Sequence, residues 1–293
     1  MSRRQSLQAR IDDYLAERRR QGFHLRSRDT FLASFARFVA AKRHRGPLTA
    51  ELMVEWVRAG KDGHGDVGTW ARSWGRLRHF ICYLRQFEPD TEIPEASLFG
   101  PEPGRVAPHI YRDDEIDDLL AAAGRLGPAG SIRPFTYETL FGLMASTGLR
   151  ISEAIHLRDA DVDLKRGMLT IRQTKFAKSR QLPIHPSTVK ALVRYRKQRE
   201  LHLPTTEGMP FLIGSRGRRL GLPLSERQAH RVFTGLRDGL GWVNRGGHDA
   251  PRLHDLRHTF AVRRLVRWYA DGADVDQKML ALSTYMGHAE IFY

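Results

Sequence analysis

The chain has 293 residues, which is long enough for two domains. Of these residues 41% are hydrophobic and 28% are charged, as in ordinary globular proteins. Lysine and arginine number 48 against 33 acidic residues, and the formal net charge of +15 indicates a polyanionic partner, most commonly nucleic acid. No apolar run approaches the roughly 18 residues of a membrane span, the N-terminus is polar and Cys82 is the single cysteine, so we expect a cytoplasmic protein without a membrane span, a disulfide framework or a cysteine metal site.

Residues 1–92 are predicted to form a bundle of four helices. Their polar faces carry many arginines and lysines with few acids between them, which suits contacts with a phosphate backbone better than a merely solvated surface. We expect the tryptophans to pack in the core and not to stack on bases. Apolar residues recur at helical spacing in four stretches: Ile11, Tyr14 and Leu15; Phe31, Leu32, Phe35, Phe38 and Val39; Leu52, Met53, Trp56 and Val57; Trp70, Trp74, Leu77, Phe80, Ile81 and Leu84.

Residues 93–111 are predicted to be a linker between two domains. Residues 93–110 contain four prolines and two glycines, a composition that excludes a helix or a central strand. The acidic run at residues 113–115 then suits a helix N-terminus, where negative charge is favoured. We therefore expect a second domain over residues 112–293.

The second domain is predicted to be mainly helical with a small antiparallel sheet. A helix over residues 135–146 is stopped by Gly148, so Arg150 lies where one helix ends and the next begins. From there a side chain can point into a cleft, although a lone arginine is more often a surface cation. Alternating residues at 168–173 and 181–184 predict a β hairpin with a basic tip, which could reach into DNA or could simply be solvated.

The functional interpretation depends on residues 253–261, where apolar residues at helical spacing predict a buried helix face. His254 and Arg257 lie three residues apart and share another face, so an imidazole, a fixed cation and a helix N-terminus could act on one phosphate. An isolated pair of this kind is more often just a solvated face. His254 and His258 also have the spacing of two zinc ligands, but the zinc-protease motif requires glutamate where Asp255 stands.

Four motifs follow one another along the second domain: Thr147-Gly148-Leu149-Arg150-x-Ser152-Glu153, Lys175 on the hairpin tip, His254-x-Leu256-Arg257-His258 and Met286-Gly287-His288. In this order they resemble the motifs of the tyrosine recombinases, the family of phage integrases and Xer-type recombinases. Each motif is weak alone, but four in the right order within a basic two-domain chain are specific. The resemblance covers the second domain closely, and the first domain resembles the family's DNA-clamping domain by architecture.

The resemblance implies site-specific DNA recombination through a 3′-phosphotyrosyl intermediate, as in the integrases of mobile genetic elements. In that mechanism Arg150 and Arg257 would neutralise the scissile phosphate as charge builds in the transition state, a role that suits the planar, permanently charged guanidinium. His254 would manage the proton of the nucleophile.

The resemblance also assigns the remaining site residues and the partners. Lys175 would protonate the departing 5′ oxygen, with Lys178 in its place if the hairpin register differs, and His288 would hydrogen-bond the phosphate from the opposite side. No cofactor is implied, because two arginines replace a metal ion and the phosphotyrosyl bond conserves the energy of the cut strand. The expected partners are double-stranded DNA and further protomers, as a tetramer on DNA and a monomer without it.

The end of the sequence departs from the family pattern. In the family the nucleophilic tyrosine follows the Gly-His motif by about nine residues, whereas Tyr293 follows His288 by five, about one helical turn short. We interpret Tyr293 as a packing aromatic and a poor substitute nucleophile, and Tyr285, which precedes the histidine, as a poorer one. We therefore expect a C-terminally incomplete catalytic domain whose nucleophile lies just beyond Tyr293, so that the chain binds DNA but does not cleave it.

Three other functions stay open on the sequence alone. A non-catalytic DNA-binding regulator or accessory factor would keep the bundle and the positive surface, but it has no need for Lys175 on a hairpin tip. A zinc hydrolase built on His254 and His258 would contain stoichiometric zinc. A type IB topoisomerase shares much of the recombinase chemistry, but the small helical first domain favours site-specific recombination.

Overall fold

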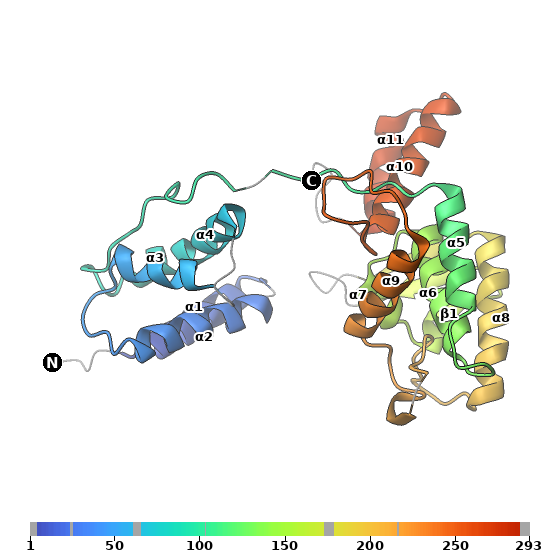
Figure 1. Cartoon of the computed structure of the whole chain (residues 1–293), viewed down its shortest axis with the longest axis horizontal. Coiled ribbons are helices and arrows are strands. Elements are labelled where there is room, and N and C mark those ends of the chain that lie inside the picture. The colour runs from blue at the N-terminus through green and yellow to red at the C-terminus, as the bar shows by residue number, and fades with distance from the viewer. Residues whose placement is uncertain are drawn as a thin grey trace. The chain divides into compact units, whose positions relative to one another are not determined.

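A computed structural model shows two compact units, residues 1–105 and residues 106–293 (Figure 1). Each unit has its own hydrophobic core, and each is described by itself. In the described part of the chain, no helix is both long and apolar enough to cross a membrane. The structure describes residues 5–23, 26–60, 66–102, 104–172, 179–215 and 217–287, without the side chains of residues 26 and 27.

The first unit is a bundle in which each helix packs against two others. Ser6, Thr49 and Asp66 each accept a hydrogen bond from a backbone N–H in the first turn of the helix that follows, which stabilises three of the helix starts. The helices are α1 (Leu7–Arg20), α2 (Arg26–Ala41), α3 (Ala50–Ala59) and α4 (Val67–Leu84).

The core of this unit is built from the predicted apolar stripes. Phe35, Trp74 and Phe80 are almost completely buried in it. The segment after α4 joins the same core, because Phe99 packs edge-on against Trp74, with ring centroids 5.3 Å apart, and the Glu95 carbonyl accepts a hydrogen bond from the Trp74 indole at 2.6 Å. The predicted linker therefore begins with residues that belong to the first unit.

The second unit is helical around a small antiparallel sheet, which confirms the predicted fold class. The sheet order is β1-β2-β3, with Leu169 opposite Leu182 and Ile171 opposite Arg180. The strands are β1 (Val162–Asp163), β2 (Met168–Ile171) and β3 (Arg180–Pro183), and two short 3₁₀ segments are η1 (Asp159–Asp161) and η3 (Gly217–Arg219). The helices are α5 (Asp113–Gly124), α6 (Arg133–Thr147), α7 (Ile151–Ile155), α8 (Pro186–His202), α9 (Glu226–Leu240), α10 (Asp255–Ala270) and α11 (Val275–Met286).

Helix α8 was not predicted from the sequence. Its buried face combines only a few apolar residues, among them Leu192 and Tyr195, with the fully buried Arg199. The Arg199 guanidinium is neutralised by Asp159 at 2.6 Å and donates to the Phe211 carbonyl. A polar sequence can thus form a packed helix when its one buried charge has partners from other segments.

Helix α6 is the central element of the second unit and packs against α5, α8 and α10. It ends at Gly148, which has a φ of +65° and donates its N–H to the Met144 carbonyl at 2.9 Å. A Cβ atom at this position would lie 2.6 Å from Cδ1 of Phe260 on α10. The glycine therefore lets the chain turn tightly against α10, and Arg150 follows this turn two residues later.

Candidate active site

Arg150 lies at the start of α7 and points at the C-terminal end of α11. Glu153 accepts the Arg150 backbone N–H through Oε2 and the Nη1 group through Oε1, both at 3.0 Å. The remaining contacts reach the Met286 carbonyl at 3.4 Å and the Gly287 carbonyl at 3.1 Å. The side chain is 31% exposed, so it can be reached from solvent.

Arg257 approaches the same point from the first turn of α10. Its Nη1 donates to the Gly148 carbonyl and its Nη2 to the Met286 carbonyl, both at 2.6 Å, and the residue is almost completely buried. Burial and the charge of Arg150 lower the pKa of Arg257 to about 9, so the guanidinium still carries its charge at neutral pH. Two cations that share one carbonyl make this place electrostatically suited to an anion.

A third guanidinium, that of Arg180, belongs to the same cluster and was missed in the sequence analysis. It donates in parallel to both carboxylate oxygens of Glu153 at 3.0 Å and through Nε to the Tyr285 carbonyl at 2.8 Å. Burial alone would raise the pKa of Glu153, but the hydrogen bonds from Arg180 and Arg150 lower it below its ordinary value, so this carboxylate is ionised. No local pattern in the sequence marks Arg180, because Glu153 already has an oppositely charged neighbour three residues away in Arg150.

The C-terminus of α11 supplies the carbonyls on which the arginines converge. Three successive carbonyls, from residues 285–287, accept from this cluster, as expected at the negative end of a helix. Gly287 ends the helix with a φ of +67°, and a Cβ atom there would lie 2.6 Å from Nη1 of Arg180. A side chain at position 287 would therefore displace the Arg180 guanidinium, and the left-handed backbone there also favours glycine.

His254 caps the start of α10, next to Arg257, and its side chain is exposed. Loss of hydration, followed by the effects of His258 and Arg257, lowers the pKa of His254 to about 4. The imidazole is therefore neutral at pH 7 and has a free lone pair with which it could accept a proton.

The arrangement of His254, His258 and Asp255 does not support the zinc hypothesis. The rings of His254 and His258 lie edge to face with centroids 5.0 Å apart. Asp255, which stands where the zinc motif needs glutamate, is fully buried and accepts from Arg252 at 2.8 Å. Within the described ranges, no group of three His, Cys, Asp or Glu side chains could hold a metal ion.

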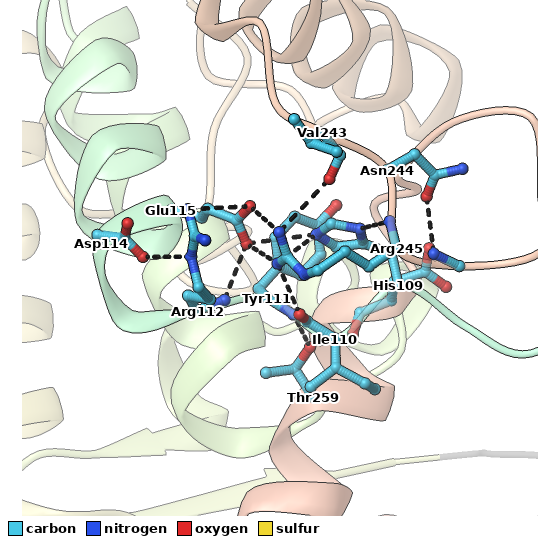
Figure 2. Close-up of polar contacts among 12 residues, drawn as sticks. His109, Ile110, Tyr111, Arg112, Asp114, Glu115, Val243, Asn244, Arg245 and Thr259 are labelled. Carbon is cyan, nitrogen blue, oxygen red and sulfur yellow. Dashed lines mark hydrogen bonds and ion pairs between the residues drawn. The ribbon is translucent and has the colours of Figure 1, made fainter.

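The loop that leads into α10 is anchored by a buried polar cluster (Figure 2). Arg245 donates to both carboxylate oxygens of Glu115, at 2.8 and 2.5 Å, and to the Ile110 carbonyl at 3.0 Å. The ring of His109 lies between them: its Nδ1 accepts the Arg245 backbone N–H, and its Nε2 lies 3.3 Å from Glu115. Hydrogen bonds, chiefly from Arg245, lower the pKa of Glu115 to about 2 against the opposing effect of its burial.

Tyr111 connects this polar cluster to α10. Its backbone N–H donates to Thr259 Oγ1 at 2.9 Å, and its hydroxyl donates to the Arg252 carbonyl at 3.0 Å. The segment that enters the second unit thus holds the helix start on which His254 and Arg257 lie.

The structure therefore brings together Arg150 and Arg257 and places His254 beside Arg257. The described Tyr285 packs parallel to Phe260, with centroids 5.7 Å apart, and donates its hydroxyl to the Pro183 carbonyl. Burial raises the pKa of Tyr285, which disfavours the phenolate form that a nucleophile would need. Four predicted residues lie outside the described residues: Lys175, Lys178, His288 and Tyr293.

The chain is similar in sequence to a known family model and to several known proteins. Residues 110–291 match the family model described as the phage integrase family. The chain is 37% identical over 284 residues to the putative integrase/recombinase y4rB of Sinorhizobium fredii, covering 96% of this chain and 88% of that protein. It is 28% identical over 283 residues to the tyrosine recombinase XerC of a Mycobacterium species, covering 94% and 89%.

Solved structures show the same fold at low sequence identity. A λ integrase dimer bound to a core site matches with a TM-score of 0.66 at 16% identity, covering 98% of this chain and 97% of that one. The Tn1549 transposon integrase in complex with a circular intermediate DNA matches with a TM-score of 0.67, also at 16% identity, covering 96% and 92%.

Proposed function

Because the chain belongs to the phage integrase family of tyrosine recombinases, we propose that its second unit binds the scissile phosphate of a DNA recombination site. The observation that carries this proposal is the convergence of Arg150 and Arg257, from separate segments, on the single Met286 carbonyl. An oxygen atom already occupies the point between two fixed cations. A phosphate oxygen could take the same place with a full negative charge.

The two arginines would bind this phosphate in different ways. Arg150 is partly exposed and needs only to exchange backbone carbonyls for phosphate oxygens. Arg257 is almost completely buried, so its Nη2 group must turn away from the Met286 carbonyl or be uncovered as DNA binds. The end of α11 is therefore the element that we expect to move when DNA is bound.

The covalent step would follow the family chemistry. A tyrosine hydroxyl attacks the phosphorus, its proton passes to the neutral His254, and the bond to the 5′ oxygen breaks. Lys175, or Lys178 in the other hairpin register, gives that oxygen a proton, while His288 donates to the phosphate. The pKa of His254, lowered to about 4, supports its role as an acceptor, because the ring is unprotonated at neutral pH.

We further propose that a polypeptide of residues 1–293 binds DNA without forming the covalent link, since the family spacing places the nucleophile beyond Tyr293. On DNA the protein would assemble with further protomers into a tetramer, and it would be a monomer without DNA. Double-stranded DNA is the proposed partner of both units, and the net charge of +15 supports this.

Selection of bound duplexes from a random pool, followed by incubation with a nicked suicide substrate, tests the proposal. We expect the 293-residue chain to enrich a defined duplex and to form no complex that survives denaturant. Failure to enrich any sequence would contradict site-specific recombination. A covalent complex that is lost on Tyr293→Phe would overturn the proposed cleavage deficiency and identify Tyr293 as the nucleophile.

A further inference from the structure

We propose that Arg180 is a positioning residue of the phosphate site, which occupies both oxygens of Glu153 and thereby keeps Arg150 available to phosphate. The inference rests on the proposed function, because it concerns the same anion site. Arg180 is the first residue of β3, at the end of the hairpin that carries Lys175, and its side chain is only 12% exposed.

The hydrogen-bond inventory of the three guanidiniums separates their roles. A guanidinium has five N–H donors. Arg180 makes four hydrogen bonds, two to Glu153 and one each to the Tyr285 and Met286 carbonyls. The side chain of Arg150 makes three such bonds and that of Arg257 makes two with the residues that the structure describes. Arg180 is thus nearly saturated by the protein, whereas its two neighbours keep donors for a ligand.

Competition for Glu153 explains what Arg180 does. The carboxylate is 7% exposed and lies within 3.0 Å of both guanidiniums. Because Arg180 takes both oxygens in parallel, the guanidinium of Arg150 reaches the carboxylate through Nη1 alone, beside the hydrogen bond from the Arg150 backbone N–H. Without Arg180, the same carboxylate would be free to hold Arg150 in a bidentate pair and draw it away from the phosphate.

Arg180 also ties this carboxylate to the end of α11. Its Nε donates to the Tyr285 carbonyl, and its Nη1 lies 2.6 Å from the position that a Cβ of residue 287 would take. One planar side chain therefore fixes the position of Glu153, and through it Arg150, relative to the residue before His288. Lysine keeps the charge but cannot donate in parallel to two oxygens and sideways to a third.

The test follows the Nε–H resonances of Arg150 and Arg257 by NMR while the 293-residue chain is titrated with orthovanadate, a tetrahedral phosphate analogue. We expect vanadate to shift both resonances in the wild type. Arg180→Met should weaken this binding about tenfold, because a charge-assisted contact network is lost. Arg180→Lys should lie between the two and also serves if the methionine variant does not fold.

Two further variants separate positioning from folding. Arg196→Met removes another partly buried arginine, 24% exposed, which bonds Asp159 and the Val162 carbonyl away from the site, and it should bind vanadate within about twofold of wild type. Arg180→Met combined with Glu153→Gln should regain most of the lost affinity, because the amide can still accept the Arg150 N–H but no longer attracts its guanidinium.

The outcomes are distinct. Vanadate binding by Arg180→Met or Arg180→Lys that equals that of Arg196→Met would overturn the positioning role. So would a double variant as weak as Arg180→Met alone, since the loss would then be structural. A wild-type chain in which vanadate shifts neither resonance would contradict the phosphate site of the proposed function itself, and with it this inference.

Discussion

At the scale of single residues, the site combines permanently charged groups with one that is kept neutral. Arg150 and Arg257 hold their charges close together, and Glu153 and the α11 carbonyls offset the repulsion between them. His254 lies beside Arg257, whose positive charge is one of the reasons, after loss of hydration and the effect of His258, why its ring resists protonation. Arg257 would therefore both attract a phosphate and keep the neighbouring imidazole neutral.

The lowered pKa of His254 predicts how stability depends on pH. In the unfolded chain the imidazole titrates near its ordinary value of 6.5, whereas in the folded chain it titrates at about 4. Between these values the unfolded state binds the extra proton, so this contribution is fully present above pH 6.5 and is lost as the pH falls toward 4. His254→Asn should reduce the fall in the unfolding temperature over this range, and NMR titration of the His254 ring should give a pKa below 5. A ring that titrates near 6.5 would contradict the lowered pKa on which this prediction rests.

At the scale of elements, the site depends on two helix ends and one anchored loop. Gly148 ends α6 against Phe260, Gly287 ends α11 against Arg180, and the cluster of Arg245 holds the loop before α10. Each device sets the position of a segment that contributes to the arginine cluster. Changes at these places should therefore act on stability and on the site together.

Gly148→Ala tests the junction of α6 and α10. Alanine must adopt the left-handed conformation there, and its Cβ would lie 2.6 Å from Phe260, so we expect a loss of about 2 kcal/mol of unfolding free energy. Gly235→Ala is the matched control, because Gly235 lies exposed within α9 with nothing within 4 Å of an added Cβ. The control should gain about 0.5–1 kcal/mol. Equal effects in urea unfolding would contradict the packing argument.

Arg245→Met tests the anchored loop through its pH dependence. The change leaves Glu115, 2% exposed, without its main partner, and we expect a loss of about 2 kcal/mol at pH 7, less than for a fully buried pair because Arg245 is 35% exposed. In the wild type the low pKa of Glu115 contributes stability above pH 4.5 that is lost as the pH falls toward 2. The difference between variant and wild type should therefore shrink on acidification. Arg112→Met, at a 62% exposed side chain, should change stability little at either pH.

Many of the helices and strands could be predicted from the sequence, because helix periodicity, helix caps and the hairpin are local patterns. The position of Gly148 after its helix and the pairing of residues 168–171 with 180–183 follow such patterns. Helix α8 was not predicted because its buried face contains a charged residue, Arg199, whose partner Asp159 lies in another segment. Arg180 was not predicted as a site residue for the same reason, because its role depends on contacts with Glu153 and α11, which lie in other segments.

At the scale of the whole molecule, charge dominates the expected behaviour. A net charge of +15 on a chain of two compact units predicts binding to any duplex, with sequence preference added by the contacts that reach the bases. We expect DNA affinity to fall about 10³-fold to 10⁵-fold between 50 and 200 mM salt. Replacing the exposed Arg72 and Arg76 of α4 with glutamine should reduce the slope of log affinity against log salt by about two. An unchanged slope would place the DNA contacts elsewhere.

Arg150 and Arg257 are proposed to bind one and the same phosphate, and a crystal structure of the 293-residue chain bound to its selected duplex would show whether they do. We predict one backbone phosphate with oxygens about 2.7–2.9 Å from both guanidiniums, with the Met286 carbonyl displaced from at least one of them. A bound duplex whose phosphates all lie beyond the reach of either arginine, with both still held by the Met286 carbonyl, would contradict the account.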